Sequence, residues 1–387
     1  MAEETKALLT SKDEDQLPEL PAGTILCEFY KVVKKIAKGG MGSIIYIVQN
    51  VNNNKYYAAK VIYKTPKTEI SWNAFKDELV TCWRVNKCPN VVHTYAEDKS
   101  NPDRLVFIMD YVDGPTLRDL IHQTHLSVEE TIYIFKKVAI ALDSIHSFRH
   151  KIIHQDLKPE NVVLSKDRSD VKILDFGIAN VLVKGRDKNH ILTKKEEIHG
   201  TFAYISPDVV KSVYMSKMNR SANAIDDVNK IVNEQLDFYA FGAMLFETLM
   251  SRKPFYAPDY EKKEVAELPL KYDLPIMSNE NPKIPVILDN IVYRCMASKP
   301  QDIKYRYNNA KEIIADLETA RKQIKQPKLT ELVKPASERS FQPASKFNFK
   351  IDKSQTKFYS SKWFFFLVCF LFVAIMVALV AVLISIK

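Results

Sequence analysis

The sequence predicts an α+β fold, with strands predominating in its first third and helices after it, followed by one transmembrane helix. Short runs rich in β-branched residues, separated by turn residues, recur up to residue 112. From residue 127 onward, apolar residues recur instead at helical spacing. Residues 363–386 carry no charged side chain over 24 positions, which is long enough for a helix to cross a bilayer.

The charge of the chain is unevenly distributed, and this bounds its partners. Residues 1–22 carry six acidic against two basic side chains and lack the blocks of a signal peptide, so we expect an acidic, disordered lead. Residues 322–362 carry ten Lys or Arg against three Asp or Glu. A basic excess beside an apolar segment favours a membrane surface as partner, and no nucleic acid is expected. The five scattered cysteines, without a CxxC pair, indicate a reduced compartment and no zinc or disulfide framework.

Residues 363–386 are the predicted membrane anchor, reached through a flexible basic juxtamembrane linker over residues 321–362. A buried core helix is the alternative, but soluble helices are rarely apolar on every face at this length. The basic residues before the segment predict a single-pass protein with a C-terminal anchor and its N-terminal bulk on the cytoplasmic side. A bacterial inner membrane and a host membrane both fit, and the oligomeric state is open.

The stretch 150–177 concentrates polar residues on predicted loops between short buried strands. Phosphoryl transfer from ATP needs positioning, divalent metal, and a group that accepts the proton of the attacking hydroxyl. The carboxylate of Asp156 can accept that proton, and Lys158 adds positive charge beside the transferred group. Asn161 and Asp175 offer the oxygen ligands that Mg²⁺ prefers.

This stretch resembles the catalytic and metal-binding loops of protein kinases over nearly all of its positions. Ordinary turn residues are the alternative, which the matching spacing and order disfavour. The resemblance implies a two-lobed protein kinase fold over residues 23–320, with a β-rich N-lobe to about residue 112 and an α-helical C-lobe from about residue 113. It also implies ATP as donor, Mg²⁺ or Mn²⁺ as metal, and protein Ser or Thr as acceptor, because Lys158 follows Asp156 by two residues as in Ser/Thr kinases.

A glycine-rich turn follows the strand predicted from Tyr30 to Ile36. Such a turn lets backbone N–H groups approach phosphates, although an ordinary hairpin turn would look similar. In position it resembles the phosphate loop of the eukaryotic-like Ser/Thr kinases of bacteria, with alanine for the first glycine and therefore, at worst, a looser grip. The resemblance assigns nucleotide contacts to Ala37, Lys38, Gly39, Gly40, Gly42 and Ile44.

The next predicted strand carries Lys60 in a Tyr-Ala-Ala-Lys motif. A lysine in an apolar strand is usually an edge residue with a solvated head. The resemblance instead makes Lys60 the partner of the α- and β-phosphates, and Ala58 the small residue that admits adenine. Ser71 can cap the next helix, and by the same resemblance Glu78 on it is in register to pair with Lys60, with Asp77 as its rival.

A buried strand ends in Met109, Asp110, Tyr111 and Val112. By resemblance, Met109 is the gatekeeper residue, and the three residues after it form the hinge whose backbone reads the adenine edge. Val163 is counted with the nucleotide-binding residues on the same basis.

Several positions depart from the kinase pattern. Gln155 replaces an arginine that normally receives an activation-loop phosphate, so we expect a non-RD kinase whose activity depends little on that phosphorylation. Thr201 resembles the hydroxyl that bridges Asp156 and Lys158, although an ordinary loop threonine would also fit. Asp208 replaces glutamate, and its pair with Arg306 is expected to be strained or water-bridged.

Two further features follow Asp208 in the sequence. Residues 211–235 form an insertion that could read a substrate or a partner, or be a neutral surface elaboration. Asp237 resembles the aspartate that holds the catalytic-loop backbone; a helix N-cap is the alternative, and one residue could fill both roles.

The sequence thus predicts a membrane-anchored Ser/Thr protein kinase that uses Asp156 as base. The rival is a catalytically weak pseudokinase scaffold at a membrane, favoured slightly by Ala37, Gln155, Phe202 and Asp208. A purely structural membrane role with an idle kinase fold is a third interpretation.

Overall fold

The structure is a computed structural model. It describes residues 17–39, 43–64, 72–98, 101–175, 202–209, 233–255, 257, 263–299 and 302–325, with the backbone alone at residues 73–79, 263, 266 and 325.

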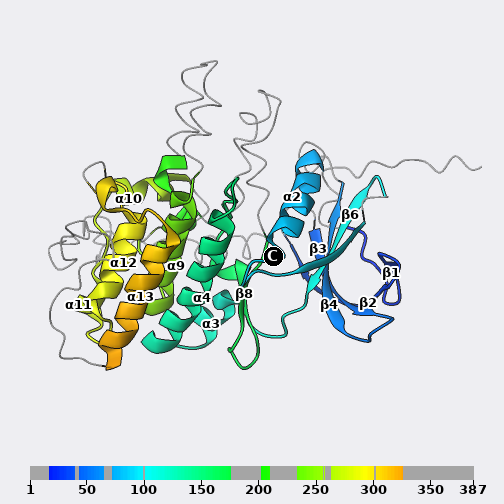
Figure 1. The fold of residues 1–387 in the computed structure, drawn as a ribbon, viewed down its shortest axis with the longest axis horizontal. Helices are drawn as coiled ribbons and strands as arrows, with labels where there is room; N and C mark the ends of the chain where they lie inside the picture. Colours follow the sequence, from blue (N-terminus) through cyan, green and yellow to red (C-terminus); the bar gives the residue numbers. More distant parts are fainter. Residues whose placement is uncertain are drawn as a thin grey trace, which may run out of the picture. The chain divides into compact units, whose positions relative to one another are not determined.

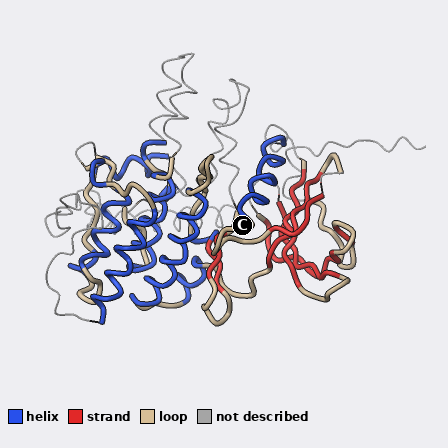
Figure 2. The backbone as a smooth tube through the Cα atoms, viewed as in Figure 1, coloured by secondary structure: helices blue, strands red, loops and turns tan. Residues whose placement is uncertain are grey.

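A six-stranded antiparallel sheet forms the N-terminal lobe, with its strands in the order β1-β2-β3-β4-β6-β5. Figure 2 shows these strands gathered in one part of the molecule, with a single helix beside them. The elements are β1 (Ile25–Leu26), β2 (Tyr30–Lys38), β3 (Ser43–Asn50), β4 (Tyr56–Tyr63), α2 (Trp72–Val85), β5 (Thr94–Asp98) and β6 (Arg104–Asp110).

The two faces of this sheet have different surroundings, and successive side chains along each strand point to opposite faces. Ala59 and Val61 of β4 belong to a buried cluster on one face. Ala58 and Lys60 therefore lie on the opposite face. In the pairing of β4 with β6, Lys60 stands opposite Phe107 and Ala58 opposite Met109. The contact of Lys60 with Asp175 shows that this face is turned toward the loop after β8.

The C-terminal lobe is helical, with one short hairpin of strands (Figure 1). Its helices are α3 (Leu117–Gln123), α4 (Val128–His146), α9 (Gln235–Met250), α10 (Leu268–Lys271), α11 (Met277–Glu280), α12 (Val286–Met296) and α13 (Ala310–Lys325). The hairpin is β7 (Val162–Leu164) with β8 (Val171–Ile173), and the 3₁₀ turns are η2 (Pro159–Asn161), η3 (Phe202–Tyr204), η4 (Lys263–Glu267) and η5 (Ile303–Tyr305).

The helix starts follow local chemistry. Ser127 caps α4 by accepting from the N–H of Glu130, whose carboxylate accepts in return from the N–H of Ser127. Thr116 and Asp119 form the same reciprocal capping box at the start of α3. Such boxes satisfy N–H groups that the helix itself cannot bond, and they fix where each helix begins.

Helix α9 is the central element of the C-terminal lobe, because it is buried along nearly its whole length. Phe241 packs edge to face on Phe135 of α4, and Gly242 lets α12 approach so closely that a Cβ there would lie 2.6 Å from Cβ of Cys295. Its polar residues are few, and two of them, Asp237 and Glu247, are buried and hydrogen-bonded. Asp237 accepts a hydrogen bond from the N–H of His154, and Glu247 accepts one from the hydroxyl of Tyr204.

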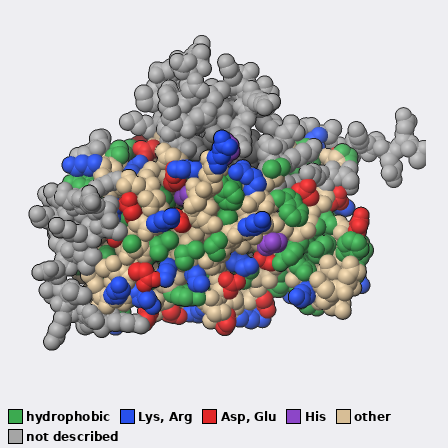
Figure 3. Space-filling view, viewed as in Figure 1, with side chains coloured by type: hydrophobic (Ala, Val, Ile, Leu, Met, Phe, Trp, Pro, Cys, Tyr) green, Lys and Arg blue, Asp and Glu red, His purple; other side chains and the backbone are tan. Residues whose placement is uncertain are grey.

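On the face drawn in Figure 3, basic and acidic side chains are interspersed over the described residues. Exposed side chains also form ion pairs, such as Arg252 with Glu280.

The sequence expectation of strands first and helices after is confirmed. The helix expected after Ser71 occupies Trp72–Val85, and the capping box at Ser127 is present. Among the residues that the structure describes, no helix is both long and apolar enough to cross a membrane. The anchor expected at residues 363–386 and residues 211–232 of the expected insertion lie outside that part of the chain.

Candidate active site

The catalytic-loop residues expected to act together are in direct contact. Nζ of Lys158 lies 2.8 Å from Oδ2 of Asp156, and Nδ2 of Asn161 donates to the same oxygen at 3.0 Å. Nδ2 of Asn161 also donates to the backbone oxygen of Asp156 at 2.7 Å. The side chain of Asp156 is 39% exposed, so this carboxylate is oriented by two neighbours and still open to an incoming hydroxyl.

Asp237 holds the turn that precedes Asp156. Its two carboxylate oxygens accept the N–H groups of His154 and Gln155, each at 2.8 Å, and Nε2 of His146 lies 2.8 Å from Oδ2. Gln155 has a φ of 64°, which a side-chain-bearing residue adopts only when its surroundings enforce it. The expected hold of Asp237 on the loop backbone is confirmed. The N-cap alternative is wrong, because the helix begins at Gln235 with Glu234 before it.

The buried position of Asp237 affects its titration. Burial by itself raises the pKa of the Asp237 carboxyl, but the hydrogen bond and charge of His146, the charge of His154 and the N–H of Gln155 outweigh it, so the pKa is lowered. The carboxylate therefore stays ionised and keeps both backbone hydrogen bonds.

The residue expected to bind metal on the second loop, Asp175, contacts the N-terminal lobe. Its Oδ1 lies 2.9 Å from Nζ of Lys60, which is 8% exposed. Burial favours the neutral acid, but the charge and hydrogen bond of Lys60 outweigh it and lower the pKa of Asp175. Strand β4 and the segment after β8 thus contribute opposite charges to one place.

Two backbone contacts join this segment to the catalytic loop. The N–H of Leu174, the residue before Asp175, donates to the backbone oxygen of Asn161 at 2.8 Å. Nε2 of His154 lies 2.8 Å from the backbone oxygen of Leu174. Asn161 and Asp175 are therefore carried on neighbouring backbone.

The donor set of these residues fits a divalent cation. Nδ2 of Asn161 is used in donating to Asp156, which leaves Oδ1 as an acceptor. Asp175 bonds Lys60 through Oδ1 and has a second carboxylate oxygen. Hard oxygen atoms from an amide and a carboxylate suit Mg²⁺, which takes few protein ligands and keeps others from phosphate and water.

The structure pairs two of the residues expected near adenine, Ala58 and Met109, across neighbouring strands. Ala58 and Lys60 share the face of β4 that looks toward the catalytic loop, and Met109 stands opposite Ala58. In the hairpin of β7 and β8, the core cluster contains Val162 and Leu164 but not Val163. Val163 therefore points to the other side of the hairpin. Tyr111 and Val112 follow β6, and the oxygen of Val112 accepts from the N–H of Gly114 at 3.0 Å.

Gly114 explains how the hinge reaches the C-terminal lobe. A Cβ at this position would lie 2.0 Å from the backbone oxygen of Leu164, so only glycine lets the two backbones approach this closely. The N–H of Leu164 then donates to the oxygen of Pro115 at 3.0 Å.

Ile44 is not brought to the site, which corrects the expectation. It is fully buried in the cluster on the far face of the sheet, and its partner in β4 is Val61. Ile45 stands opposite Lys60 and takes the place expected of Ile44. Neighbouring residues of a strand point to opposite faces, so Ile45, and not Ile44, shares the face of Lys60.

Of the phosphate turn, the structure describes Ala37, Lys38 and Gly39 at the exposed end of β2. The N–H of Gly39 donates to the oxygen of Ser43 at 2.8 Å, and this bond closes the turn. The remaining residues expected in the site lie outside what the structure describes: Gly40, Gly42, Thr201, and the side chains of Glu78 and Asp77.

The Asp110 side chain plays a part that the sequence did not indicate. Its carboxylate accepts from Nζ of Lys172 at 2.6 Å, from the N–H of His93 at 3.0 Å, and from the hydroxyl of Tyr95 at 2.8 Å. Burial opposes ionisation, but these hydrogen bonds outweigh it and lower the pKa of Asp110. Because Lys172 belongs to β8, this ion pair joins the hinge to the strand that leads to Asp175.

The pair of Asp208 with Arg306 forms directly. Nη1 of Arg306 lies 2.7 Å from Oδ2 of Asp208, and its Nε donates to the backbone oxygen of Ala297 at 2.6 Å. The expected water bridge is therefore wrong, because the shorter side chain of aspartate reaches its partner directly.

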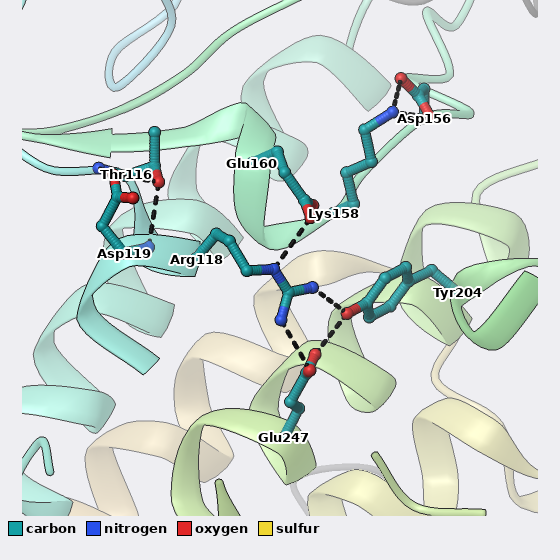
Figure 4. A network of polar contacts seen from close by, with 8 residues as sticks. All are labelled: Thr116, Arg118, Asp119, Asp156, Lys158, Glu160, Tyr204 and Glu247. Carbon is teal, nitrogen blue, oxygen red and sulfur yellow. Dashed lines mark hydrogen bonds and ion pairs between the residues drawn. The ribbon is translucent and has the colours of Figure 1, made fainter. Parts of the chain in front are cut away.

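A second network, drawn in Figure 4, was also missed from the sequence. Arg118 of α3 binds Glu160 of the catalytic loop, Glu247 of α9 and Tyr204 of η3, and the Tyr204 hydroxyl also donates to Glu247. The one available signal was Glu247, a carboxylate in the largely apolar second half of its helix.

Comparison with known proteins agrees with this geometry. Residues 30–302 match the family model described as the protein kinase domain. A relative from Mycoplasma genitalium, whose name includes "serine/threonine-protein kinase", is 33% identical over 393 residues, covering 94% of this chain and 97% of that protein. A relative from Mycoplasma pneumoniae, whose name includes the same words, is 33% identical over 348 residues, covering 83% of this chain and 85% of its own. Serine/threonine-protein kinase PrkC of Bacillus subtilis is 27% identical over 297 residues, covering 75% of this chain and 40% of that protein.

Proposed function

Because the chain belongs to the protein kinase family and is a serine/threonine protein kinase, we propose that it transfers the γ-phosphoryl group of ATP to a protein hydroxyl with Asp156 as the base. The observation that carries the proposal is the meeting of two charged groups of opposite lobes beside one oriented carboxylate. Lys60 reaches Asp175 from the sheet, and Asn161 connects the backbone of that segment to Asp156.

In the proposed step, the oxygen of the acceptor Ser or Thr bonds to the γ-phosphorus, and the bond from that phosphorus to the β,γ-bridging oxygen breaks. ADP leaves, and the hydroxyl proton passes to Asp156. Lys158 and Asn161 hold the Asp156 carboxylate in one orientation, which is the positioning that this reaction chiefly requires. The charge of Lys158 also lies beside the group that is transferred.

Asn161 and Asp175 would hold the metal. Lys60 would bind the α- and β-phosphates through its ammonium group. Bound Mg²⁺ or Mn²⁺ would neutralise charge on the phosphate oxygens. Ala58, Ile45 and Val163 supply an apolar surface for a base, with Ile45 in place of Ile44.

We also propose that residues 363–386 anchor the enzyme in a membrane with the kinase domain on the cytoplasmic side. The proposal is supported by the 24 uncharged residues of that segment and by the basic residues that precede it. The acceptor would then be a protein at the same membrane.

The test is transfer of labelled phosphate by the full-length chain in detergent micelles, with Mg²⁺ or Mn²⁺, to itself and to myelin basic protein. Asp156→Asn should abolish label on Ser and Thr while the ATP-induced rise in melting temperature persists. Asp170→Asn, at an exposed aspartate between β7 and β8, is the matched control and should keep full transfer. Equal transfer by Asp156→Asn would remove Asp156 from its role. A wild-type chain that binds ATP without transferring label would favour the pseudokinase scaffold instead.

A further inference from the structure

We propose that Arg118 is a positioning residue that holds the segment 202–209 against the catalytic loop and thereby sets where the protein acceptor lies. This inference rests on the proposed function. In-line transfer places the acceptor on the side of Asp156 away from the nucleotide. Lys60 marks the nucleotide side, whereas Tyr204 of the segment 202–209 meets the catalytic loop through Arg118.

Each nitrogen group of the Arg118 guanidinium has its own partner. Nε donates to Oε1 of Glu160 at 2.8 Å, and Nη1 donates to Oε1 of Glu247 at 2.7 Å. Nη2 donates to the hydroxyl oxygen of Tyr204. Figure 4 shows the three partners arranged around one planar group, each from a different element of the C-terminal lobe. A guanidinium holds several acceptors in one plane, which the point charge of a lysine cannot do.

The partner in the catalytic loop is well placed to pass this constraint on. Glu160 lies in η2, between Lys158 and Asn161, and both of those residues hold the Asp156 carboxylate. Arg118 itself is fixed, because the helix that carries it begins at the capping box of Thr116. A shift of Arg118 would therefore move the Glu160 turn relative to Asp156.

Helix α9 supplies a rigid reference for the same loop. Asp237, in its first turn, binds the backbone before Asp156, and Glu247 binds Arg118 ten residues later, about 15 Å along the helix axis. One buried helix thus holds the catalytic loop at one end directly and at the other through Arg118.

The hydroxyl of Tyr204 can serve both of its contacts. It accepts from Arg118 and donates to Glu247, which requires a protonated phenol. Burial, together with the Glu247 charge, raises the pKa of Tyr204, so the phenol keeps its proton. Glu247 is 4% exposed, and its carboxylate depends on Arg118 and Tyr204 for compensation.

The test uses the full-length chain with Arg118→Leu, Arg118→Lys and Tyr204→Phe, with ATP and myelin basic protein varied separately. We expect Arg118→Leu to lower kcat/KM for the protein acceptor by about 10- to 100-fold, as misplacement by about 1 Å does, while KM for ATP changes less than about twofold. Arg118→Lys should recover little, because it keeps the charge but not the fork. Tyr204→Phe should show the same acceptor-specific loss to a smaller degree.

Two controls separate positioning from general stability. Arg252→Leu removes an exposed ion pair with Glu280 and should leave both kinetic constants unchanged. Arg294→Leu removes a buried arginine that binds Glu312 and Asp316 far along the chain, and it should lower the melting temperature without an acceptor-specific loss. An Arg118→Leu variant in which KM for ATP and for the acceptor deteriorate equally, as in a loosened fold, would overturn the proposal.

Amide hydrogen exchange provides a readout that does not need activity. In folded Arg118→Leu, amides of residues 202–209 and 158–161 should exchange faster, while those of β3 and β4 keep their wild-type rates. Unchanged protection of residues 202–209 would overturn the positioning role. A wild-type chain without transfer would count against the proposed function alone, because the exchange result still decides whether Arg118 couples the two segments.

Discussion

Nζ of Lys60 lies 2.9 Å from Oδ1 of Asp175, so an ion pair connects strand β4 of the N-terminal lobe to the segment after β8 in the C-terminal lobe. Lys60 is buried at 8% exposure and carries its charge on the sheet face that looks toward the catalytic loop. The pair preorganises two charged groups that the proposed reaction uses.

Replacement of Lys60 by methionine keeps most of the buried stem and removes the charge. We expect kcat/KM for transfer to fall by at least about 10²- to 10³-fold, as is typical when one preorganised electrostatic group is lost. Steady-state kinetics with ATP as the varied substrate measure this. Lys55→Met, at an exposed lysine just before β4, is the control and should keep wild-type rates. If Lys60→Met retained half of the wild-type kcat/KM, the ion pair would have no part in the reaction.

The ion pair of Lys172 with Asp110 predicts an effect confined to the nucleotide. Lys172→Met leaves the hinge carboxylate with His93 and Tyr95 but disconnects it from β8. We expect KM for ATP to rise about three- to tenfold with kcat nearly constant, because a typical hydrogen bond contributes a net of about 1 kcal/mol.

The control for this prediction lies a few residues away. Lys166 pairs with Asp113 at 2.6 Å, but their side chains are 75% and 56% exposed. Surface pairs contribute little, so Lys166→Met should leave KM for ATP unchanged. If the two variants behaved alike, the Lys172 pair would be a surface contact without influence on the hinge.

The catalytic-loop residues could be predicted from the sequence because they are close together in it. Asp156, Lys158 and Asn161 fall within six residues, and their spacing alone implies a shared site. Arg118, Tyr204 and Glu247 come from three segments that are distant in the sequence, and only the fold brings them together.

The incorrect prediction that Ile44 lies at the site has a different cause. Ile44 and Ile45 are both β-branched and apolar, so the sequence offers no preference between them. The hairpin register decides which of the two faces Lys60, and it places Ile45 there. The pairing of β2 with β3 is irregular between Val32 and Lys34 and again between Lys35 and Ala37, which the sequence pattern does not reveal.

The buried carboxylate of Asp237 predicts a particular dependence of stability on pH. Its pKa is lower in the folded chain than in the unfolded chain, so its contribution to stability is present above the unfolded value of about 3.9 and is lost as pH falls through the folded value. His146 of α4 and His154 of the catalytic loop are the titratable groups that face it. Asp237→Asn should lower the free energy of unfolding by about 3 kcal/mol at pH 7, and the difference from wild type should shrink below about pH 4.

Urea denaturation at pH values from about 3 to about 7, which bracket the ordinary pKa of a carboxyl group, measures this difference. Asp289 is the matched control, since it is also buried and accepts from the N–H of Met277 at 2.6 Å, but burial raises its pKa. Its contribution has the opposite sign: it is fully present below the unfolded pKa and is lost as pH rises through the folded pKa. A difference between wild type and Asp237→Asn that stayed constant over the whole range would show that the charge of Asp237 is not what stabilises the loop.

The proposed anchor predicts a separation of attachment from catalysis. Deletion of residues 363–386 removes the uncharged segment and keeps the basic linker before it. The full-length chain should float with vesicles of neutral and anionic lipid in a density gradient, whereas the deleted chain should remain mostly in the soluble fraction. A basic segment alone binds anionic lipid weakly, at about 1 kcal/mol for each Lys or Arg near the surface, and high salt should release it. Transfer to myelin basic protein should stay within about twofold, since the described active-site contacts all lie before residue 326. Co-flotation of the deleted chain at high salt would refute anchoring by residues 363–386, and loss of transfer would show that the segment also supports the catalytic lobes.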